Sequence, residues 1–299
     1  MSPAPKAIII SAADELYALL ANDLFTSIRG LAFTTTFDLG ILDVGLSDNN
    51  RKYFQSLGIK VVPAISDIDY PSREQWEAKR PGVRTLTARP FLRRYFPGYD
   101  IYIWLDADVW VQTPEAIETM IASAANSPAI HIAPELDRCY SAFFTNADIW
   151  MKFHDWYKTN FPPDIAGAMS LKPMLNAGVF AMSKESPVWD AWAQIYTEAL
   201  QKTTELSDKS FMTDQLGLNI LLYMRGFPCV LLPPSYNWLT FYAIPMLNRN
   251  TGMLVEPLPP HRPISQIHLT RPNKNVLEQV RCLDGTTLER RLTYKGEGT

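Results

Sequence analysis

The chain has 299 residues, 47% of them hydrophobic, so it is long enough for a full core in one large domain or two small ones. Its formal net charge of −3 at pH 7 argues against general nucleic-acid binding. Three widely spaced cysteines fit a reducing compartment, and no apolar run approaches the roughly 20 residues that span a bilayer. The N-terminus also lacks the features of a signal peptide, so we expect a soluble, cytoplasmic protein.

Strand and helix patterns alternate over the first third of the chain. Short apolar runs predict four buried strands, at residues 6–11, 35–45, 60–65 and 101–108. This alternation predicts a parallel sheet with helices on both faces. Ligands bind such sheets beyond the carboxyl ends of the strands, and two polar stretches, 11–14 and 106–108, fall at those ends.

Helices are expected between these strands. Residues 47–58 are predicted helical, with Ser47 as N-cap and Gly58 as C-cap. Residues 85–100 are helical in part, and their first proline must lie in a first turn or kink the helix. Residues 14–31 show helical spacing of apolar side chains, which predicts one packed face made of Leu16, Leu19, Leu20, Leu24 and Ile28.

The second half of the chain mixes strands and helices. A helix is predicted at 186–202, capped by Ser186 with Pro187 at its first position. Another is predicted at 213–226, capped by Thr213 and closed by Gly226. An Asp-Gly pair between alternating residues predicts a hairpin within 280–294. Strands are predicted at 129–135, 175–183, 228–238 and 264–270.

No internal repeat or linker divides the chain, so we expect one domain at residues 1–275 and a C-terminal appendage at 276–299 that forms a hairpin. From His261 onward there are seven Lys or Arg and four Asp or Glu, so this tail is net +3 (7 − 4). The charge fits a solvated surface, and it also fits peripheral contact with a membrane or an anionic acceptor. Both interpretations stay open.

Asp106 and Asp108 follow the buried run 101–105 directly. Two buried carboxylates repel each other unless a cation lies between them or one is protonated. Held together without metal, they would cost free energy that a bound ion recovers. Mg²⁺ or Mn²⁺ is the natural cation, because both accept oxygen ligands and share them with substrate phosphates.

The acidic pair has two other interpretations. An Asp-x-Asp on its own is most simply a turn whose aspartates are solvated. A dehalogenase-type phosphatase is disfavoured, because Trp110 stands where that chemistry expects Thr or Val.

Six motifs occur in an order that resembles a known family, over about residues 6–275: SAADELYA, LDVGLSDNNRKYFQSLG, LTARPFLRRYFPGYDIYIWLDADVWV, LNAGVF, TDQLGLN and HLTRPNK. The sequence resembles a retaining glycosyltransferase of the family that includes glycogenin and bacterial lipooligosaccharide galactosyltransferases. The resemblance implies an α/β, single-domain, Rossmann-like nucleotide-diphospho-sugar transferase (GT-A) fold with a mixed central sheet. It also implies a UDP-sugar donor, Mn²⁺ or Mg²⁺ as cofactor, and a saccharide or glycolipid acceptor.

The resemblance also implies roles for single residues at matching positions. Asp106, Asp108 and His268 match the metal ligands, and Lys274 matches a lysine on the diphosphate. The remaining matches are the base and ribose contacts Ala12, Asp14 and Tyr17, the donor-sugar contacts Arg89, Asn176 and Ala177, and the carboxylate Asp214 and amide Gln215 at the sugar. Asn176, Asp214 and Gln215 are the expected catalytic residues.

The match departs from the family pattern at the nucleotide clamp, where Arg271 replaces a glycine and Asn275-Val276 replaces Pro-Trp. Glycine there lets backbone approach phosphate, so an arginine would either crowd the site or add a phosphate contact. Acceptor contacts are expected near Glu135 and Asp137, and the aromatic cluster 238–242 fits core packing and an acceptor platform equally well. A second function class, a catalytically silent nucleotide-sugar-binding protein on the same fold, stays open. The intact set of metal ligands favours the enzyme.

Overall fold

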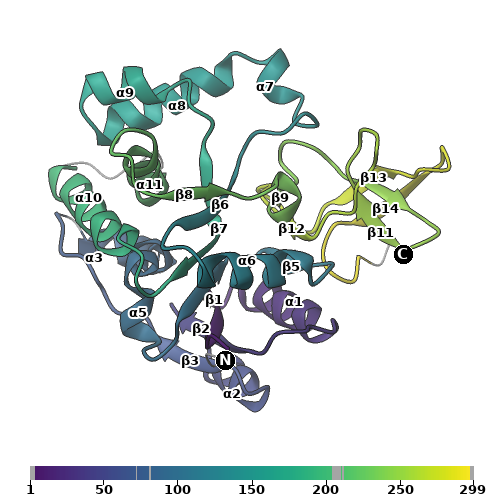
Figure 1. Ribbon diagram of the computed structural model, residues 1–299, viewed down its shortest axis with the longest axis horizontal. Coiled ribbons are helices and arrows are strands. Elements are labelled where there is room, and N and C mark those ends of the chain that lie inside the picture. The colour runs from purple at the N-terminus through teal and green to yellow at the C-terminus, as the bar shows by residue number, and fades with distance from the viewer. Residues whose placement is uncertain (1–3, 72, 81, 204–209, 211, 297–299) are drawn as a thin grey trace.

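A computed structural model of the protein describes residues 4–71, 73–80, 82–203, 210 and 212–296. The strands of its central sheet are β1 (Ala7–Ala13), β2 (Phe37–Asp43), β3 (Lys60–Pro63), β4 (Ile101–Leu105), β6 (Ile130–Pro134), β7 (Leu175–Ser183) and β8 (Cys229–Leu231). They lie in the order β3-β2-β1-β4-β7-β6-β8 through the middle of the molecule (Figure 1). The first four are parallel, whereas β7 is antiparallel to both β4 and β6. The predicted mixed central sheet is confirmed.

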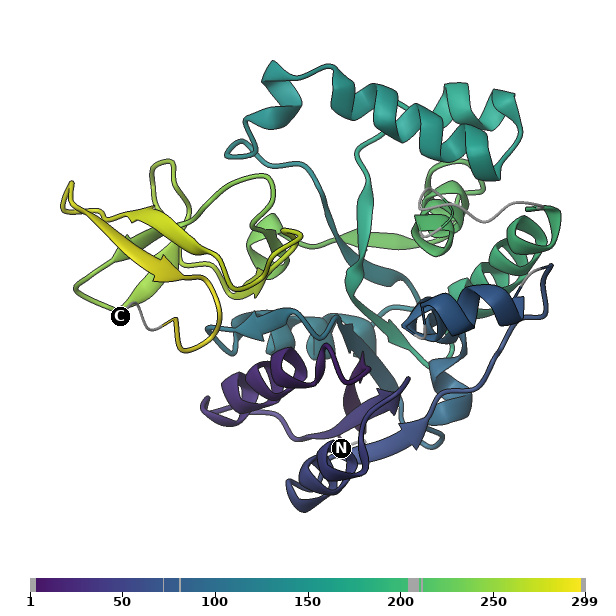
Figure 2. The ribbon, with the colours of Figure 1, turned by 180° about the vertical axis from the view of Figure 1, so that it is seen from behind.

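Helices cover both faces of this sheet, as Figures 1 and 2 show from opposite sides. They are α1 (Ala18–Arg29), α2 (Asp48–Ser56), α3 (Arg73–Lys79), α4 (Val83–Ala88), α5 (Leu92–Tyr95), α6 (Glu115–Ala125), α7 (Ala142–Thr145), α8 (Asp148–Asn160), α9 (Pro163–Met169), α10 (Val188–Lys202) and α11 (Thr213–Tyr223), with 3-10 turns η1 (Arg89–Phe91) and η3 (Pro234–Tyr236). Alternate residues of β1 enter two different cores. Ile9 packs with Leu24 of α1 and Ile117 of α6, whereas Ile8 belongs to the core that holds Trp192 of α10.

Within the residues that the structure describes, three smaller sheets lie beside the central one. They consist of β5 (Val109–Val111), β12 (Gln266–His268) and β9 (Trp238–Leu239), of β10 (Met246–Asn248) and β11 (Met253–Val255), and of β13 (Leu277–Arg281) and β14 (Thr287–Arg291). The antiparallel pairing of β12 with β5 puts His268 opposite Val109. Because Val109 directly follows Asp108, this pairing brings a histidine from far along the chain to the Asp-x-Asp turn.

The first helix is shorter than predicted. Leu16 lies before its first turn and is 86% exposed, and Leu19 is 68% exposed. The prediction that both leucines pack in the core is wrong, because the buried face of the helix follows another set of positions. That face consists of Ala18, Ala21, Leu24, Phe25 and Ile28.

The predicted helix ends agree only in part with those in the structure. Ser47 caps α2 as predicted, and Gly58 lies one residue beyond its C-cap with φ of +70°. Pro187 occupies the N-cap position of α10 rather than the first helical position. Thr213 is not a cap, because it is the first residue of α11 and its hydroxyl donates to a preceding carbonyl. Gly226 adopts φ of +68° three residues after that helix ends.

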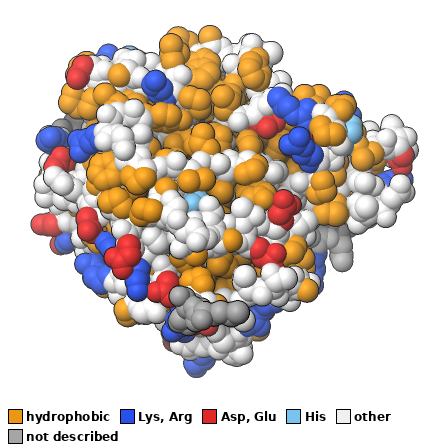
Figure 3. Space-filling model, viewed as in Figure 1, with side chains coloured by type: hydrophobic (Ala, Val, Ile, Leu, Met, Phe, Trp, Pro, Cys, Tyr) orange, Lys and Arg blue, Asp and Glu red, His pale blue; other side chains and the backbone are white. Residues whose placement is uncertain are grey.

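The segment α7 to α9 matches none of the predicted elements and lies above the sheet in Figure 1. It buries Phe143 and Phe153 but leaves Phe144, Met151 and the following Leu171 exposed. Figure 3 shows hydrophobic side chains open to solvent over this part of the molecule. None of the helices in the described part of the chain is long and apolar enough to cross a membrane.

The C-terminal hairpin is formed by β13 and β14, with φ of +85° at Gly285 in its turn. It packs against the rest of the chain: Leu292 is buried, and its carbonyl oxygen accepts a hydrogen bond of 2.7 Å from Trp110 Nε1. Residues 297–299, at the end of the predicted appendage, lie outside the described residues. The division of the chain between residues 275 and 276 stays a prediction.

Candidate active site

The carboxylates of Asp106 and Asp108 and the imidazole of His268 come together just beyond the carboxyl end of β4. One ligand atom from each lies within 4.8 Å of the others. His268 Nε2 is 3.2 Å from Asp108 Oδ1 and 3.9 Å from Asp106 Oδ2. Backbone hydrogen bonds hold the turn in place, because Asp106 N donates to Gly178 O and Leu269 N donates to Asp108 O. The three predicted ligands therefore form one cluster.

The space between these ligands exists because residue 178 is glycine. A Cβ atom on Gly178 would lie 2.6 Å from His268 Cε1 and 2.7 Å from Asp106 Oδ2, closer than such contacts occur in proteins. Two carboxylates and an imidazole form a mixed oxygen and nitrogen donor set, which suits Mn²⁺ better than an all-oxygen site would. Both the donor atoms and the space that Gly178 leaves fit a divalent ion.

His268 is oriented by Asn237, a residue that the sequence patterns did not single out. Asn237 Nδ2 donates to Asn176 Oδ1 at 2.9 Å, so its Oδ1 atom is left to face His268 Nδ1, also at 2.9 Å. Because this oxygen only accepts, Nδ1 carries a proton in the contact, and Nε2 is the ring nitrogen that would bind a cation. The sequence signal for Asn237 is weak: a single amide within an aromatic run.

Each aspartate has a cationic partner in addition to the histidine. Arg89 Nη2 is 2.5 Å from Asp106 Oδ1, and Lys274 Nζ is 2.7 Å from Asp108 Oδ2. Burial alone would raise the pKa of Asp108, but His268 and Lys274 hold it well below its usual range. The expectation that the two carboxylates repel each other without relief in the metal-free protein is therefore wrong.

Arg89 also binds a second carboxylate. Its Nη1 atom is 2.6 Å from Asp214 Oδ2 in the first turn of α11. Both side chains are buried, with residue exposures of 5% and 1%. Burial raises the pKa of Asp214, and the Arg89 guanidinium opposes that effect. One buried arginine thus joins Asp106 at the end of β4 to the start of a helix more than a hundred residues later.

The amides of Asn176 and Gln215 meet on Glu135. Gln215 Oε1 accepts from Ala177 N at 2.9 Å, and Gln215 Nε2 donates to Glu135 Oε1 at 3.0 Å. Asn176 Nδ2 donates to the same oxygen at 2.7 Å, and Tyr242 Oη donates to Glu135 Oε2 at 2.9 Å. Glu135 therefore fixes the direction of both predicted catalytic amides.

One cavity of about 710 Å³ brings these groups together with the end of β1. Every predicted site residue lines it except Ala177, which contributes its backbone N–H behind Gln215. Asp14 accepts from Tyr17 N at 3.1 Å, and Tyr17 is 40% exposed. Burial, with the neighbouring aspartates, raises the pKa of Tyr17 to about 12, so its hydroxyl stays neutral. An exposed neutral ring at the cavity is suited to stacking on a base.

The model of glycosyl transferase family 8 matches residues 8–253, more than half of the chain. The chain belongs to glycosyl transferase family 8. The fold resembles that of the galactosyltransferase LgtC, solved in complex with donor and acceptor sugar analogues, with a TM-score of 0.53 and 16% identity over 89% of this chain and 87% of LgtC. An active-site mutant of LgtC gives a TM-score of 0.52 and 17% identity over 89% and 88%. At such low identity the likeness shows the fold alone. No curated protein sequence matches the chain.

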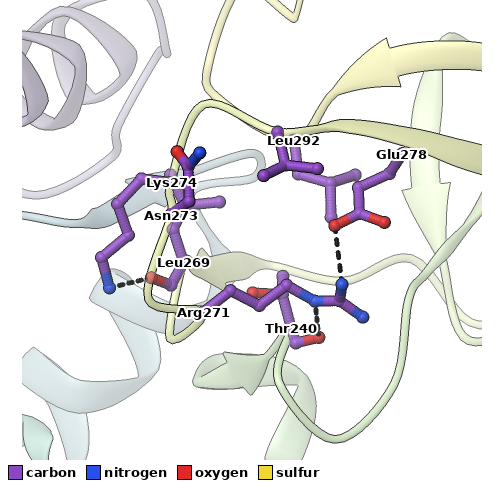
Figure 4. A pocket seen from close by; sticks show the side chains of 8 residues that line it. Thr240, Leu269, Arg271, Asn273, Lys274, Glu278 and Leu292 are labelled. Carbon is purple, nitrogen blue, oxygen red and sulfur yellow. Dashed lines mark hydrogen bonds and ion pairs between the residues drawn. The ribbon is translucent and has the colours of Figure 1, made fainter.

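Arg271, which departs from the expected family 8 pattern, points away from Lys274 (Figure 4). Its Nη1 atom is 2.8 Å from Glu278 Oε1, and its Nε atom donates to Thr240 O at 3.3 Å. The arginine therefore neither crowds the cavity nor reaches toward a phosphate there. It is engaged with the C-terminal hairpin.

Only some residues of the predicted acceptor region line the cavity. Trp238 is fully buried and packs on Tyr140, so it belongs to the core. Phe241 and Tyr242 line the cavity, as does Glu135. Asp137 accepts a hydrogen bond from the Cys139 backbone N–H. Two of the three clustered aromatic side chains are therefore placed to meet a ligand.

Glu135→Gln should change how the stability of this family 8 protein depends on pH. Burial raises the pKa of Glu135, so the folded state binds a proton that the unfolded state releases near pH 4. Wild-type stability then falls as pH rises from about 4.3 through the raised pKa. Glutamine does not titrate, and its amide nitrogen can donate to Tyr242. We expect the variant to gain stability relative to wild type as pH rises, measured by urea unfolding at several pH values. A constant difference would contradict this expectation.

Proposed function

We propose that this protein is a metal-dependent glycosyltransferase that moves a sugar from a UDP-sugar to an acceptor hydroxyl with retention of anomeric configuration. The observation that carries the proposal is the union, in one cavity, of the Asp106, Asp108 and His268 cluster with Lys274 and the carboxyl end of β1. This combination suits a ligand with a diphosphate between a base and a sugar.

A divalent ion held by Asp106, Asp108 and His268 would supply positive charge to the leaving diphosphate. Lys274, which already lies 2.7 Å from Asp108, would add a second charge at the same group. Tyr17 would stack on the base. Arg89 holds Asp214 so that the donor-sugar hydroxyls meet a fixed carboxylate.

Retention of configuration requires either a covalent intermediate or attack from the face that the phosphate leaves. We favour attack from the same face, guided by the leaving phosphate. Gln215 is a neutral amide and a poor nucleophile, Asp214 is paired with Arg89, and Glu135 already accepts three hydrogen bonds. Asn176 and Gln215, both fixed by Glu135, would orient the sugar rather than bond to it.

UDP and Mn²⁺ should bind cooperatively, because diphosphate oxygens complete the coordination of an ion held by three side chains. We expect Mn²⁺ to raise the affinity for UDP by at least about tenfold, and UDP to raise the affinity for Mn²⁺ by the same factor. Titration calorimetry of UDP with and without Mn²⁺ measures this coupling. Equal affinity in both conditions would remove the main support for a metal shared with the nucleotide.

Turnover separates the enzyme from a catalytically silent nucleotide-sugar-binding protein on the same fold. The enzyme should hydrolyse or transfer sugar from a UDP-sugar with Mn²⁺ present, lose that activity in excess chelator, and regain it when Mn²⁺ is restored. A chain that binds UDP and Mn²⁺ cooperatively but turns over no UDP-sugar would favour the silent alternative.

The acceptor in this proposal is a saccharide or a glycolipid, met by Phe241 and Tyr242 at the cavity. A cytoplasmic location is also part of the proposal, supported by the free thiols of Cys139, Cys229 and Cys282. Peripheral contact with a membrane through the basic C-terminal segment stays a prediction.

A further inference from the structure

The loop from residue 269 to residue 275, here called the lysine loop, lies between the cavity and the C-terminal hairpin. Thr270, Pro272 and Lys274 line the cavity. Lys274 also borders a second, smaller pocket, which Arg271 lines together with Glu278. Figure 4 shows the side chains of Arg271 and Lys274 extending in opposite directions. The loop therefore turns one set of side chains toward the ligand and another toward the hairpin.

Contacts on the outer side fasten this loop to β13 and β14. Arg271 Nη1 lies 2.8 Å from Glu278 Oε1 of β13, and the Glu278 side chain is only 15% exposed. Arg291 Nε of β14 donates to Asn275 O at 3.2 Å. The hairpin itself is anchored, because Leu292 accepts the hydrogen bond from Trp110 of β5. A chain of contacts thus runs from the sheet that bears His268, through the hairpin, to the lysine loop.

A loop that is already ordered before binding lowers the entropic cost of binding a ligand. A lysine on an unfastened loop loses backbone and side-chain freedom when it meets a diphosphate, and that loss opposes binding. Here Lys274 already lies at the metal cluster, bonded to Leu269 O and paired with Asp108. An ion pair on the far side of the loop can keep it there without entering the cavity.

We propose that Arg271 and Glu278 are positioning residues: their ion pair holds the lysine loop against the C-terminal hairpin and so holds Lys274 in place for the diphosphate. The inference rests on the proposed function, because it assumes that Lys274 contacts the nucleotide. It makes the hairpin a working part of the nucleotide site, although no described residue of β13 or β14 lines the cavity.

Calorimetry of UDP in the presence of Mn²⁺ tests this role. Arg271→Ala and Glu278→Ala should each lower the affinity about three- to tenfold, the range expected when one long side chain is no longer ordered in advance. The double variant should be no worse than the more affected single variant, because both remove the same ion pair. Glu289→Ala is the matched control: it removes an exposed carboxylate of the same hairpin, one that accepts a hydrogen bond from the exposed Gln279, and it should leave the affinity unchanged.

A second cycle asks whether the effect passes through Lys274. In a Lys274→Ala background, Arg271→Ala should cause no further loss of UDP affinity. If Arg271→Ala bound UDP as tightly as wild type and only its melting temperature fell, the ion pair would have a structural role alone. That result would overturn the inference. An equal loss with and without Lys274 would also overturn it. Absence of UDP binding by the wild-type protein with Mn²⁺ would overturn the proposed function as well, so the two failures are distinguishable.

Discussion

Asp108→Asn should weaken the binding of UDP in the presence of Mn²⁺ by at least about tenfold, because it replaces one of two carboxylate ligands with a neutral amide. The metal-free variant should also lose about 1–3 kcal/mol of unfolding free energy. Asp108 is 8% exposed and lies 2.7 Å from Lys274 Nζ and 3.2 Å from His268 Nε2, so its charge is stabilised in the folded protein. Calorimetry and denaturant unfolding measure the two effects.

The pH dependence gives this prediction a sign. The pKa of Asp108 is lowered by folding, so its charge stabilises the protein above the unfolded pKa of about 4, and that stabilisation fades as pH falls further. The stability difference between wild type and variant should shrink with it. Asp190→Asn is a suitable control, because Asp190 is exposed and should cost less than about 1 kcal/mol. A metal-free Asp108→Asn protein as stable as wild type would mean that the contacts with Lys274 and His268 contribute nothing.

Arg89→Ala should lower the unfolding free energy of the metal-free protein by about 3–5 kcal/mol, because it leaves the buried Asp214 and the partly buried Asp106 without their shared cation. Asp106 and Asp214 lie 2.5 Å and 2.6 Å from separate nitrogens of this one guanidinium. Arg89→Lys should recover only part of the loss, since an ammonium group cannot reproduce the planar fork that meets both carboxylates. Denaturant unfolding provides the measurement.

A neighbouring arginine gives the matched control for this variant. Arg93 is one helical turn further on and pairs with the exposed Asp190, so Arg93→Ala should cost less than about 1 kcal/mol. Adding Asp214→Asn to Arg89→Ala should restore part of the stability, because it removes one uncompensated charge. A small effect of Arg89→Ala, with no rescue by Asp214→Asn, would mean that water already solvates these carboxylates.

The sheet could be predicted because its strands follow from local patterns. The apolar run before Asp106 forms a buried strand as predicted, although β4 ends at Leu105, three residues before the end of the predicted strand. The nine residues of β7 also match their predicted range. The buried faces of helices were harder to predict, because the leucines at 16 and 19 are as hydrophobic as the buried residues beside them. Which face of the helix packs depends on the sheet below it, which no local window contains.

The contacts between the side chains of the site were harder to predict than the residues that form it. The resemblance pointed to His268, but its position beside Asp108 depends on the pairing of β5 with β12, about 160 residues apart along the chain. Asp106 pairs with Arg89 and Asp108 pairs with Lys274, but these contacts depend on the positions of side chains in the fold. The spacing of the residues along the sequence does not reveal them. For the same reason the outward direction of Arg271 could not be anticipated, and both of the outcomes expected for it assumed that it faces the ligand.

Gly178 differs from the other residues of the metal cluster in what it provides. The ligands provide atoms, whereas residue 178 provides room, and one methyl group there would occupy the space between His268 and Asp106. A relative with alanine at this position would keep every ligating side chain, but His268 and Asp106 would have to move to make room for the methyl group, so we expect it to bind an ion more weakly. In this fold, the presence of the acidic pair and the histidine is therefore an incomplete guide to which relatives are enzymes. The residue at position 178 has to be considered together with them.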